Sequence, residues 1–172
     1  MNVDIELKIM ECAKNSFMRL GFKETTLASV CQKAGVTTGA FYKRFSSKEK
    51  LLERIVLPEV QVFEEQLIST KKTSENTILP SWCLSYIYSH WEAFRLLVMC
   101  PDAALYKTCC SELTEAVIQS ILMNRTISTE NIPLVGLAAK SYLAGLFEVI
   151  RCNLNYEAAE GCIRSLDRLL VL

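Results

Sequence analysis

Apolar residues recur every three or four positions along almost the whole 172-residue chain, which is the spacing of one face of an α-helix. Over residues 4–20, for example, Ile5, Ile9, Ala13 and Phe17 share one face of a predicted helix, and Gly21 ends it. No stretch shows the strict alternation and turn residues that mark a sheet. The expected fold class is therefore all-α.

Two short helices are predicted next, over residues 26–34 and 38–45. Thr25 or Thr26 precedes the first and Thr37 precedes the second, where a hydroxyl oxygen can accept a bond from a free helical amide. Gly35 stands where a helix end favours left-handed backbone. Two short helices joined by one tight turn predict a helix-turn-helix, with Cys31 small enough to let the helices cross closely.

A longer helix is predicted to begin near Ser47 and to continue toward residue 68. Ser46 and Glu49 have the spacing of a capping box at its start. Pro58 lies inside this helix, where it removes one amide hydrogen bond and crowds the preceding turn. We therefore expect a kink or a break near Leu57.

The rest of the chain predicts four more helices, over residues 79–100, 102–125, 132–152 and 157–170, after a polar linking loop at 69–76. The second of them is long enough to consist of two pieces. We expect two domains: a head of three helices in residues 1–48 and a helical body in residues 49–172. The fold class is thus an N-terminal helix-turn-helix head joined to a C-terminal all-helical body.

Charge separates these two parts. The whole chain has 19 basic and 19 acidic residues, but residues 1–50 hold nine basic and five acidic ones, whereas residues 51–172 hold ten and fourteen. A basic head on an acidic body is typical of a phosphate-binding module that is joined to a domain with a different function.

The sequence also argues against a secreted protein, a membrane protein and an enzyme. The N-terminus has no basic, then apolar, signal-peptide pattern, and the apolar stretch 132–150 is interrupted by Lys140 and Glu148. We expect a cytoplasmic protein with no membrane partner. There is no Ser/His/Asp set, no phosphate-binding glycine loop and one isolated histidine, His90, so neither an enzyme nor a cofactor or metal is expected.

The eight cysteines form no CxxC pair, and most lie on apolar helical faces, which favours reduced cysteines in the core. The adjacent pair Cys109 and Cys110 leaves one alternative open, a thiol-responsive regulator. That function needs exposed sulfur with thiolate character.

The second helix of a helix-turn-helix lies in the major groove of DNA. Its face opposite Phe41 and Phe45 combines hydroxyls, a phenol and cations, which suit phosphates and base edges. The residues of this face are Thr37, Thr38, Gly39, Tyr42, Lys43 and Arg44. Lys48, at the start of the next helix, can share a phosphate with free amides. A helical hairpin without a DNA role is the alternative interpretation.

The stretch GFKETTLASVCQKAGVTTGAFYKRFSSKEKLL closely resembles the DNA-binding domain of the TetR family of transcriptional regulators. The resemblance covers roughly residues 5–55 and lies in Gly21-Phe22, Thr25-Thr26, Val30, Ala34-Gly35-Val36, Gly39, Phe41-Tyr42, Phe45, Ser47-Lys48-Glu49 and Leu51. Cys31 departs from the pattern, because the family often has alanine there. The chain after residue 70 carries no such motif.

This resemblance implies a homodimeric regulator whose head binds a palindromic operator in double-stranded DNA and whose body binds a small hydrophobic effector that releases a repressor. It implies phosphate contacts for Thr26, Tyr42 and Lys48. Thr37, Thr38, Lys43 and Arg44 then become candidates for base-edge contacts. The main alternative is an all-α ligand-binding or protein-interaction module whose basic head contacts a protein or membrane surface.

Two sites are expected in the body. Aromatic and other apolar side chains predict an effector cavity, although each also suits an ordinary core: Trp82, Tyr86, Trp91, Phe94, Met99, Tyr106 and Phe147. Small residues and an apolar stripe on the last two helices predict a dimer interface, with closure of the monomer core as the alternative: Leu137, Ser141, Ala144, Gly145, Glu148, Ile163, Leu166 and Leu170.

Overall fold

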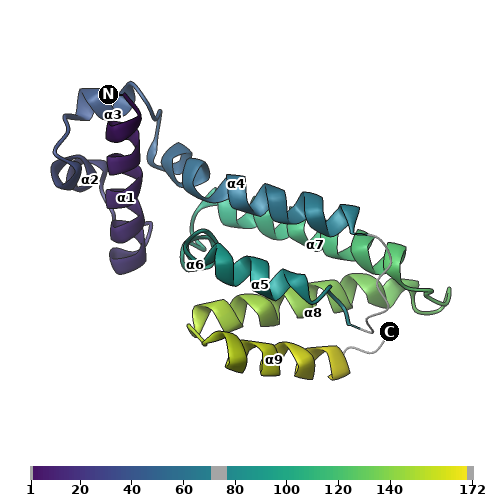
Figure 1. Ribbon diagram of the computed structural model, residues 1–172. Helices are drawn as coiled ribbons and strands as arrows, with labels where there is room; N and C mark the ends of the chain where they lie inside the picture. Colours follow the sequence, from purple (N-terminus) through teal and green to yellow (C-terminus); the bar gives the residue numbers. More distant parts are fainter. Residues whose placement is uncertain (1, 71–76, 170–172) are drawn as a thin grey trace. The chain divides into compact units, whose positions relative to one another are not determined.

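The structure is a computed structural model that describes residues 2–70 and 77–169, and every regular element in these ranges is an α-helix (Figure 1). In chain order the helices are α1 (Asn2–Leu20), α2 (Leu27–Ala34), α3 (Thr38–Tyr42), α4 (Lys48–Ser69), α5 (Trp82–Ser89), α6 (Trp91–Met99), α7 (Ala104–Asn124), α8 (Ile132–Arg151) and α9 (Tyr156–Leu169). The all-α prediction is confirmed, because the helical spacing of apolar residues sets the local structure throughout.

Contacts divide the chain into two units, which are described separately below. The N-terminal unit comprises Met1–Glu59 and Glu92–Thr108, and the C-terminal unit comprises Val60–Trp91 and Cys109–Leu172. Helix α6 therefore belongs with the N-terminal helices, and α4 and α7 each contribute residues to both units. The domain boundary expected between residues 48 and 49 stays a prediction.

In the N-terminal unit, α1 packs against α2 and α2 packs against α3. Ile5, near the start of α1, is half-buried, but most of the apolar positions that define the helical faces in the sequence are buried here: Ile9, Ala13, Phe17, Val30, Cys31, Phe41, Phe45 and Leu51. The rings of Phe41 and Phe45 lie 5.5 Å apart, as expected for residues one helical turn apart. This small core holds α3 against the rest of the unit.

The start of α4 differs from the prediction by one residue. Ser47 Oγ, not Ser46, caps the helix by accepting a hydrogen bond from Lys50 N at 3.2 Å. The helix then continues without interruption through Pro58 to Ser69, so the predicted break near Leu57 is wrong. A proline costs one hydrogen bond, and the neighbouring turns of a 22-residue helix tolerate that loss here.

The single helix predicted over residues 79–100 is wrong, because two helices, α5 and α6, occupy this range. His90 separates them with φ −116° and ψ 35°, outside helical backbone geometry. Its ring stacks on Tyr86 with centroids 4.1 Å apart, and its Nδ1 lies 2.9 Å from the Tyr86 carbonyl oxygen. A side chain that binds a terminal carbonyl stabilises a helix end without needing glycine or proline. In contrast, α7 is one continuous helix.

In the C-terminal unit, α8 and α9 pack against each other and are joined by residues 152–155. Asn153 takes the left-handed backbone conformation, φ 55°, which asparagine tolerates better than most residues. Asn155 Oδ1 caps α9 by accepting from Ala158 N at 2.9 Å. Within the described ranges α8 is the one helix long and apolar enough to cross a membrane, and its buried side chains, such as Tyr142 and Phe147, suit a core helix equally well.

Candidate nucleic-acid interface

The helix-turn-helix is built by two threonine caps and one glycine. Thr26 Oγ1 accepts from Ser29 N at 3.2 Å at the start of α2, and Thr37 Oγ1 accepts from Ala40 N at 3.1 Å at the start of α3. Gly35 ends α2 with φ 66°, in the left-handed region. These predicted caps are confirmed. A threonine hydroxyl that accepts a hydrogen bond at a helix cap still has its own proton to donate. Thr26 can therefore cap α2 and donate a hydrogen bond to a phosphate at the same time.

Helix α3 is shorter than predicted, ending at Tyr42 and not near Phe45. Phe41 is fully buried, whereas Thr37, Thr38, Gly39 and Lys43 are exposed around it. Tyr42 is 55% exposed, and its ring meets the ring of Phe41 edge-on with centroids 5.4 Å apart. The exposed face therefore presents hydroxyls, a phenol and an ammonium group outward, as the sequence predicts for a helix that enters a DNA groove.

Gly39 has no structural reason inside the unit. Its φ is not positive, and a Cβ atom added there would meet only Thr37 Oγ1, at 3.9 Å, an ordinary contact. Glycine in a helix nevertheless costs roughly 1 kcal/mol relative to alanine. The contacts within the unit therefore do not explain glycine at this exposed position, and its predicted contact with DNA stays a prediction.

The guanidinium group of Arg44 is less available for a base contact than the sequence suggests. It is half-buried, and its Nη1 donates to the carbonyl oxygen of Ala40 at 3.0 Å. A bidentate contact to guanine needs two free guanidinium N–H groups in one plane. The base contact of Arg44 remains a prediction that requires a different rotamer from the one observed.

Lys48 has a structural environment that the sequence does not reveal. Its Nζ donates to the carbonyl oxygens of Phe22 at 2.6 Å, Thr25 at 2.9 Å and Lys23 at 3.3 Å, and it lies 4.5 Å from the centroid of the Phe22 ring. Three acceptors match the three N–H groups of an ammonium ion. The ammonium group thus ties the start of α4 to the loop between α1 and α2, and this role competes with its predicted phosphate contact.

The predicted effector residues are divided between the two units. Phe94, Met99 and Tyr106 belong to the N-terminal unit, while Trp82, Tyr86, Trp91 and Phe147 belong to the C-terminal unit. Within the C-terminal unit, Trp82 and Tyr86 surround Phe63 at ring distances of 5.5 and 5.6 Å, and Trp91 packs on Tyr88 at 5.0 Å. Mutual packing of this kind is the core role that the sequence left open, and the effector role of these residues remains a prediction.

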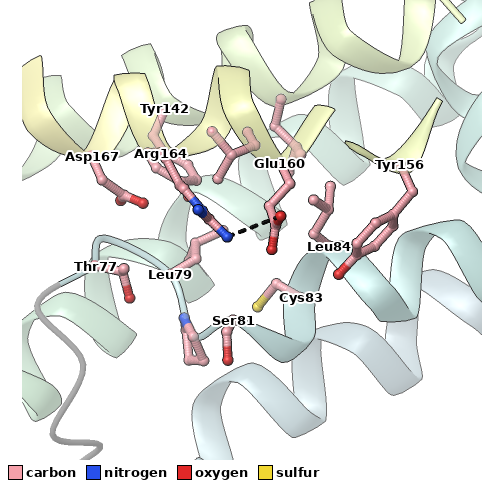
Figure 2. Close-up of a pocket in the computed structure, with 13 residues that line it drawn as sticks. Thr77, Leu79, Ser81, Cys83, Leu84, Tyr142, Tyr156, Glu160, Arg164 and Asp167 are labelled. Atoms are coloured by element: carbon pink, nitrogen blue, oxygen red, sulfur yellow. Dashed lines mark ion pairs between the residues drawn. The ribbon is translucent and has the colours of Figure 1, made fainter. Parts of the chain in front are cut away.

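A cavity that the sequence did not predict lies within the C-terminal unit (Figure 2). It has a volume of about 190 Å³ and is lined by α5, α8, α9 and residues 77–81. None of the seven predicted effector residues lines it. Its residues come from segments up to 90 positions apart, so no local motif could have identified them.

The predicted dimer residues lie on α8 and α9, mostly on the outer face. Leu137, Ala144 and Glu148 are exposed, and Ser141, Gly145 and Leu166 are half-buried. An apolar groove between the two helices is lined by Gly145, Glu148, Cys152, Cys162, Leu166 and Leu169, among others. Ile163 instead lines the cavity of Figure 2, and Leu170 falls outside the described residues.

The pair Cys109 and Cys110 lacks the character of a thiol sensor. Cys109 is fully buried, and burial, reinforced by Glu112 and Glu64, raises its pKa to about 12. Cys110 is half-buried. Because thiolate is the reactive form, these surroundings disfavour the thiol-responsive alternative. No disulfide forms among the eight cysteines, all of which the structure describes.

Comparisons with known proteins give the same picture as the geometry of the head. Residues 9–55 match the family described as "Bacterial regulatory proteins, tetR family". The HTH-type transcriptional regulator YfiR of Bacillus subtilis is 31% identical over 90 residues, or 52% of this chain and 42% of that protein. The HTH-type transcriptional regulator TtgR of Pseudomonas putida is 32% identical over 77 residues, or 45% and 36%. The chain thus matches less than half the length of these curated relatives.

Solved structures resemble the fold over nearly the full chain. A TetR-like transcriptional regulator from Rhodococcus sp. RHA1 matches with a TM-score of 0.67 at 18% identity, covering 95% of this chain and 93% of that one. NalD of Pseudomonas aeruginosa, described as the secondary repressor of the MexAB-OprM multidrug efflux pump, matches with a TM-score of 0.66 at 19% identity, covering 95% and 94%. At these identities the likeness shows the helical fold and nothing finer.

Proposed function

The chain belongs to the TetR family of transcriptional regulators, and on this premise we propose that it is a ligand-responsive repressor. As a cytoplasmic homodimer it binds a palindromic operator in double-stranded DNA, and a small, largely apolar effector bound by the body releases it. The relatives named above are all described as transcriptional regulators, in agreement with the expectation that the chain is not an enzyme.

The observation that carries the proposal is the exposed face of α3. Phe41 anchors this helix in the core while Thr38, Gly39, Tyr42 and Lys43 remain exposed. Glycine at 39 has no role inside the unit, and a phosphate backbone is a partner that approaches closely. A module that recognised an acidic protein surface would not need this combination of close approach and base-sized polar side chains.

A dimer is required for recognition of a palindrome, because two recognition helices must enter successive major grooves about 34–36 Å apart. The exposed apolar residues of α8 and α9 support a two-fold interface of paired helices. Leu137 on α8, which is 63% exposed, and Leu169 on α9, which is 79% exposed, support this interface together, because apolar surface exposed on two neighbouring helices favours burial by a partner more than a single exposed leucine does.

Two helices are placed to carry an effector signal to the head. Lys14 Nζ on α1 forms an ion pair with Glu92 on α6 at 2.5 Å, within the N-terminal unit. Helix α6 follows α5 after the single residue His90, and α4 runs unbroken past Pro58. We propose that effector binding shifts these helices and changes the spacing of the heads, for which a coupling free energy of about 1–3 kcal/mol suffices.

The experiment that tests the function is selection of bound fragments from random DNA, followed by affinity measurement at several salt concentrations. We expect a palindromic consensus and an affinity that falls steeply with added salt, because phosphate contacts release counterions. Lys43→Ala should weaken DNA binding and reduce the slope of log affinity against log salt concentration by about one unit. Lys107 is also exposed, and Lys107→Ala should change neither quantity. Salt-independent binding or no enriched sequence would refute the proposal.

A further inference from the structure

The cavity of the C-terminal unit is lined by apolar and polar side chains, and Figure 2 shows Thr77, Ser81, Glu160, Arg164 and Asp167 spread around it. Leu79, Leu84 and Leu146 supply much of the apolar lining, the buried Tyr142 supplies a hydroxyl, and the half-buried Asp167 supplies a carboxylate. The volume of about 190 Å³ is comparable with a cavity of about 150 Å³ that holds a benzene molecule. The space therefore suits a compact ligand with an apolar body and one polar group.

In the lining of the cavity, Thr77 Oγ1 is buried without a hydrogen-bond partner among the described residues, and Tyr142 is 1% exposed. Burial raises the pKa of Tyr142, so the phenol keeps its proton. Buried hydroxyls usually find a partner, because an unpaired buried hydroxyl loses its bonds with water. A ligand in the cavity would supply that partner.

Asp167 brings a carboxylate to the same cavity. Its Oδ1 accepts a hydrogen bond from Ile78 N at 2.7 Å. This bond and the charge of Arg125 both act to lower its pKa, yet burial outweighs them and the pKa of Asp167 is raised. Within the described ranges Asp167 forms no ion pair, so its negative charge is only partly compensated.

The other charged residues of the lining compensate each other. Arg164 Nη2 forms an ion pair with Glu160 at 3.0 Å, one helical turn away on α9 (Figure 2). An anionic ligand would meet the carboxylates of both Glu160 and Asp167, and it would have to displace Glu160 to reach Arg164. A cationic ligand meets a lining whose uncompensated charge is that of Asp167.

We propose that this cavity binds a small organic amine, with its ammonium group on the Asp167 carboxylate and the Tyr142 hydroxyl and its apolar body between Leu79, Leu84 and Leu146. Ammonium supplies three donors, the carboxylate and the phenol oxygen accept them, and a charge-assisted bond is stronger than a neutral one. The inference rests on the proposed effector binding and names the chemical class of the effector.

The test measures binding of benzylamine to the full chain by calorimetry in the absence of DNA, with benzyl alcohol and benzoate as uncharged and anionic analogues. Benzylamine should bind at least about tenfold more tightly than benzyl alcohol, as expected for one charge-assisted hydrogen bond, and benzoate should not bind. Equal affinity for the alcohol, stronger binding of benzoate, or no binding of any probe would each overturn the proposal.

Variants then locate the site. Asp167→Asn keeps an acceptor for Ile78 N but removes the charge, so it should weaken benzylamine binding by about tenfold or more and leave benzyl alcohol unaffected. Leu146→Trp should abolish binding of both by filling the cavity. Asp102→Asn, at an exposed position of the other unit, is the matched control.

Separate measurements distinguish a variant that does not fold, a chain that does not bind DNA and a cavity that does not bind the amine. Circular dichroism and thermal unfolding show whether each variant folds. If Asp167→Asn does not fold, Tyr142→Phe provides the second variant, and unchanged benzylamine affinity in it would overturn the proposed contact. Operator binding is measured separately, so a chain that binds DNA but no amine refutes the amine site alone.

Discussion

The Cδ1 atom of Leu166 on α9 lies 2.5 Å from the position that a Cβ atom would occupy at Gly145 on α8. At this point the two helices of the hairpin approach so closely that Leu166 keeps its observed rotamer only beside glycine. Both residues line the apolar groove that we propose as part of the dimer interface.

We expect Gly145→Ala to lower the thermal unfolding midpoint only slightly, because the new methyl group meets the end of the half-buried Leu166 side chain, which can rotate away at a cost of about 1 kcal/mol or less. Combining it with Leu166→Ala should recover part of the loss, as a double-mutant cycle would show. Gly136→Ala on the same helix is the control: a Cβ there meets nothing within 4 Å, so helix propensity should make that variant slightly more stable.

Leu137→Glu should convert the proposed dimer into monomers, since a carboxylate would replace an exposed leucine on the face of α8 that we propose to pair. Light scattering at micromolar concentration measures the mass. Leu122→Glu on α7 replaces another exposed leucine and should leave the dimer intact. A monomeric unaltered chain would refute the interface, and an unaffected dimer in Leu137→Glu would remove Leu137 from it.

Gly39→Ala should separate folding from DNA binding. The structure has room for the methyl group, so the variant should unfold at the same or a slightly higher temperature. Its operator affinity should nevertheless fall, because the added Cβ occupies space that a close-approaching DNA backbone needs. Unchanged affinity in a fluorescence anisotropy titration would mean that Gly39 does not lie against DNA.

Lys48→Met should destabilise the head by about 1.5–3 kcal/mol, because it removes charged hydrogen bonds to the carbonyls of Phe22 and Thr25 while it keeps an apolar chain beside the Phe22 ring. Chemical denaturation measures this loss. If the stability of Lys48→Met equals that of the unaltered chain and the salt dependence of DNA binding becomes shallower, the phosphate contact predicted from the sequence is the main role of Lys48.

Glu64 should make stability depend on pH. Burial and the nearby carboxylate of Glu112 raise its pKa from 4.5 to about 7, and its Oε1 is buried without a partner among the described residues. The folded state binds the Glu64 proton more tightly than the unfolded state does. The stability that comes from this protonated carboxyl is fully present below pH 4.5 and is lost as the pH rises through about 7.

Glu64→Gln removes this titration, so at pH 8 the variant should be more stable than the unaltered chain by about 1 kcal/mol, after allowance for solvent screening of a half-buried group. Denaturation midpoints between pH 4 and pH 8 are the measurement, with values spaced by roughly half a unit. Glu65→Gln, at the exposed neighbouring position, should leave the pH dependence unaltered. The same pH profile in both variants would contradict the assignment to Glu64.

The sequence alone determined the helical fold, the helix-turn-helix and the identity of its exposed face. These features depend on spacing within one or two helical turns and on caps such as Thr37 and Gly35, which are local properties of the chain. The resemblance of residues 5–55 to a known family depends on the same local pattern.

Only the tertiary structure revealed the surroundings of Lys48, Tyr142 and Asp167. Lys48 binds carbonyls 23 to 26 positions earlier, and Asp167 accepts a hydrogen bond from a residue 89 positions earlier. The break at His90 likewise depends on a ring stacked on Tyr86, which no proline or glycine announces. The free energy of a buried charge or hydroxyl depends on which groups surround it in space, and sequence spacing carries no information about neighbours that distant.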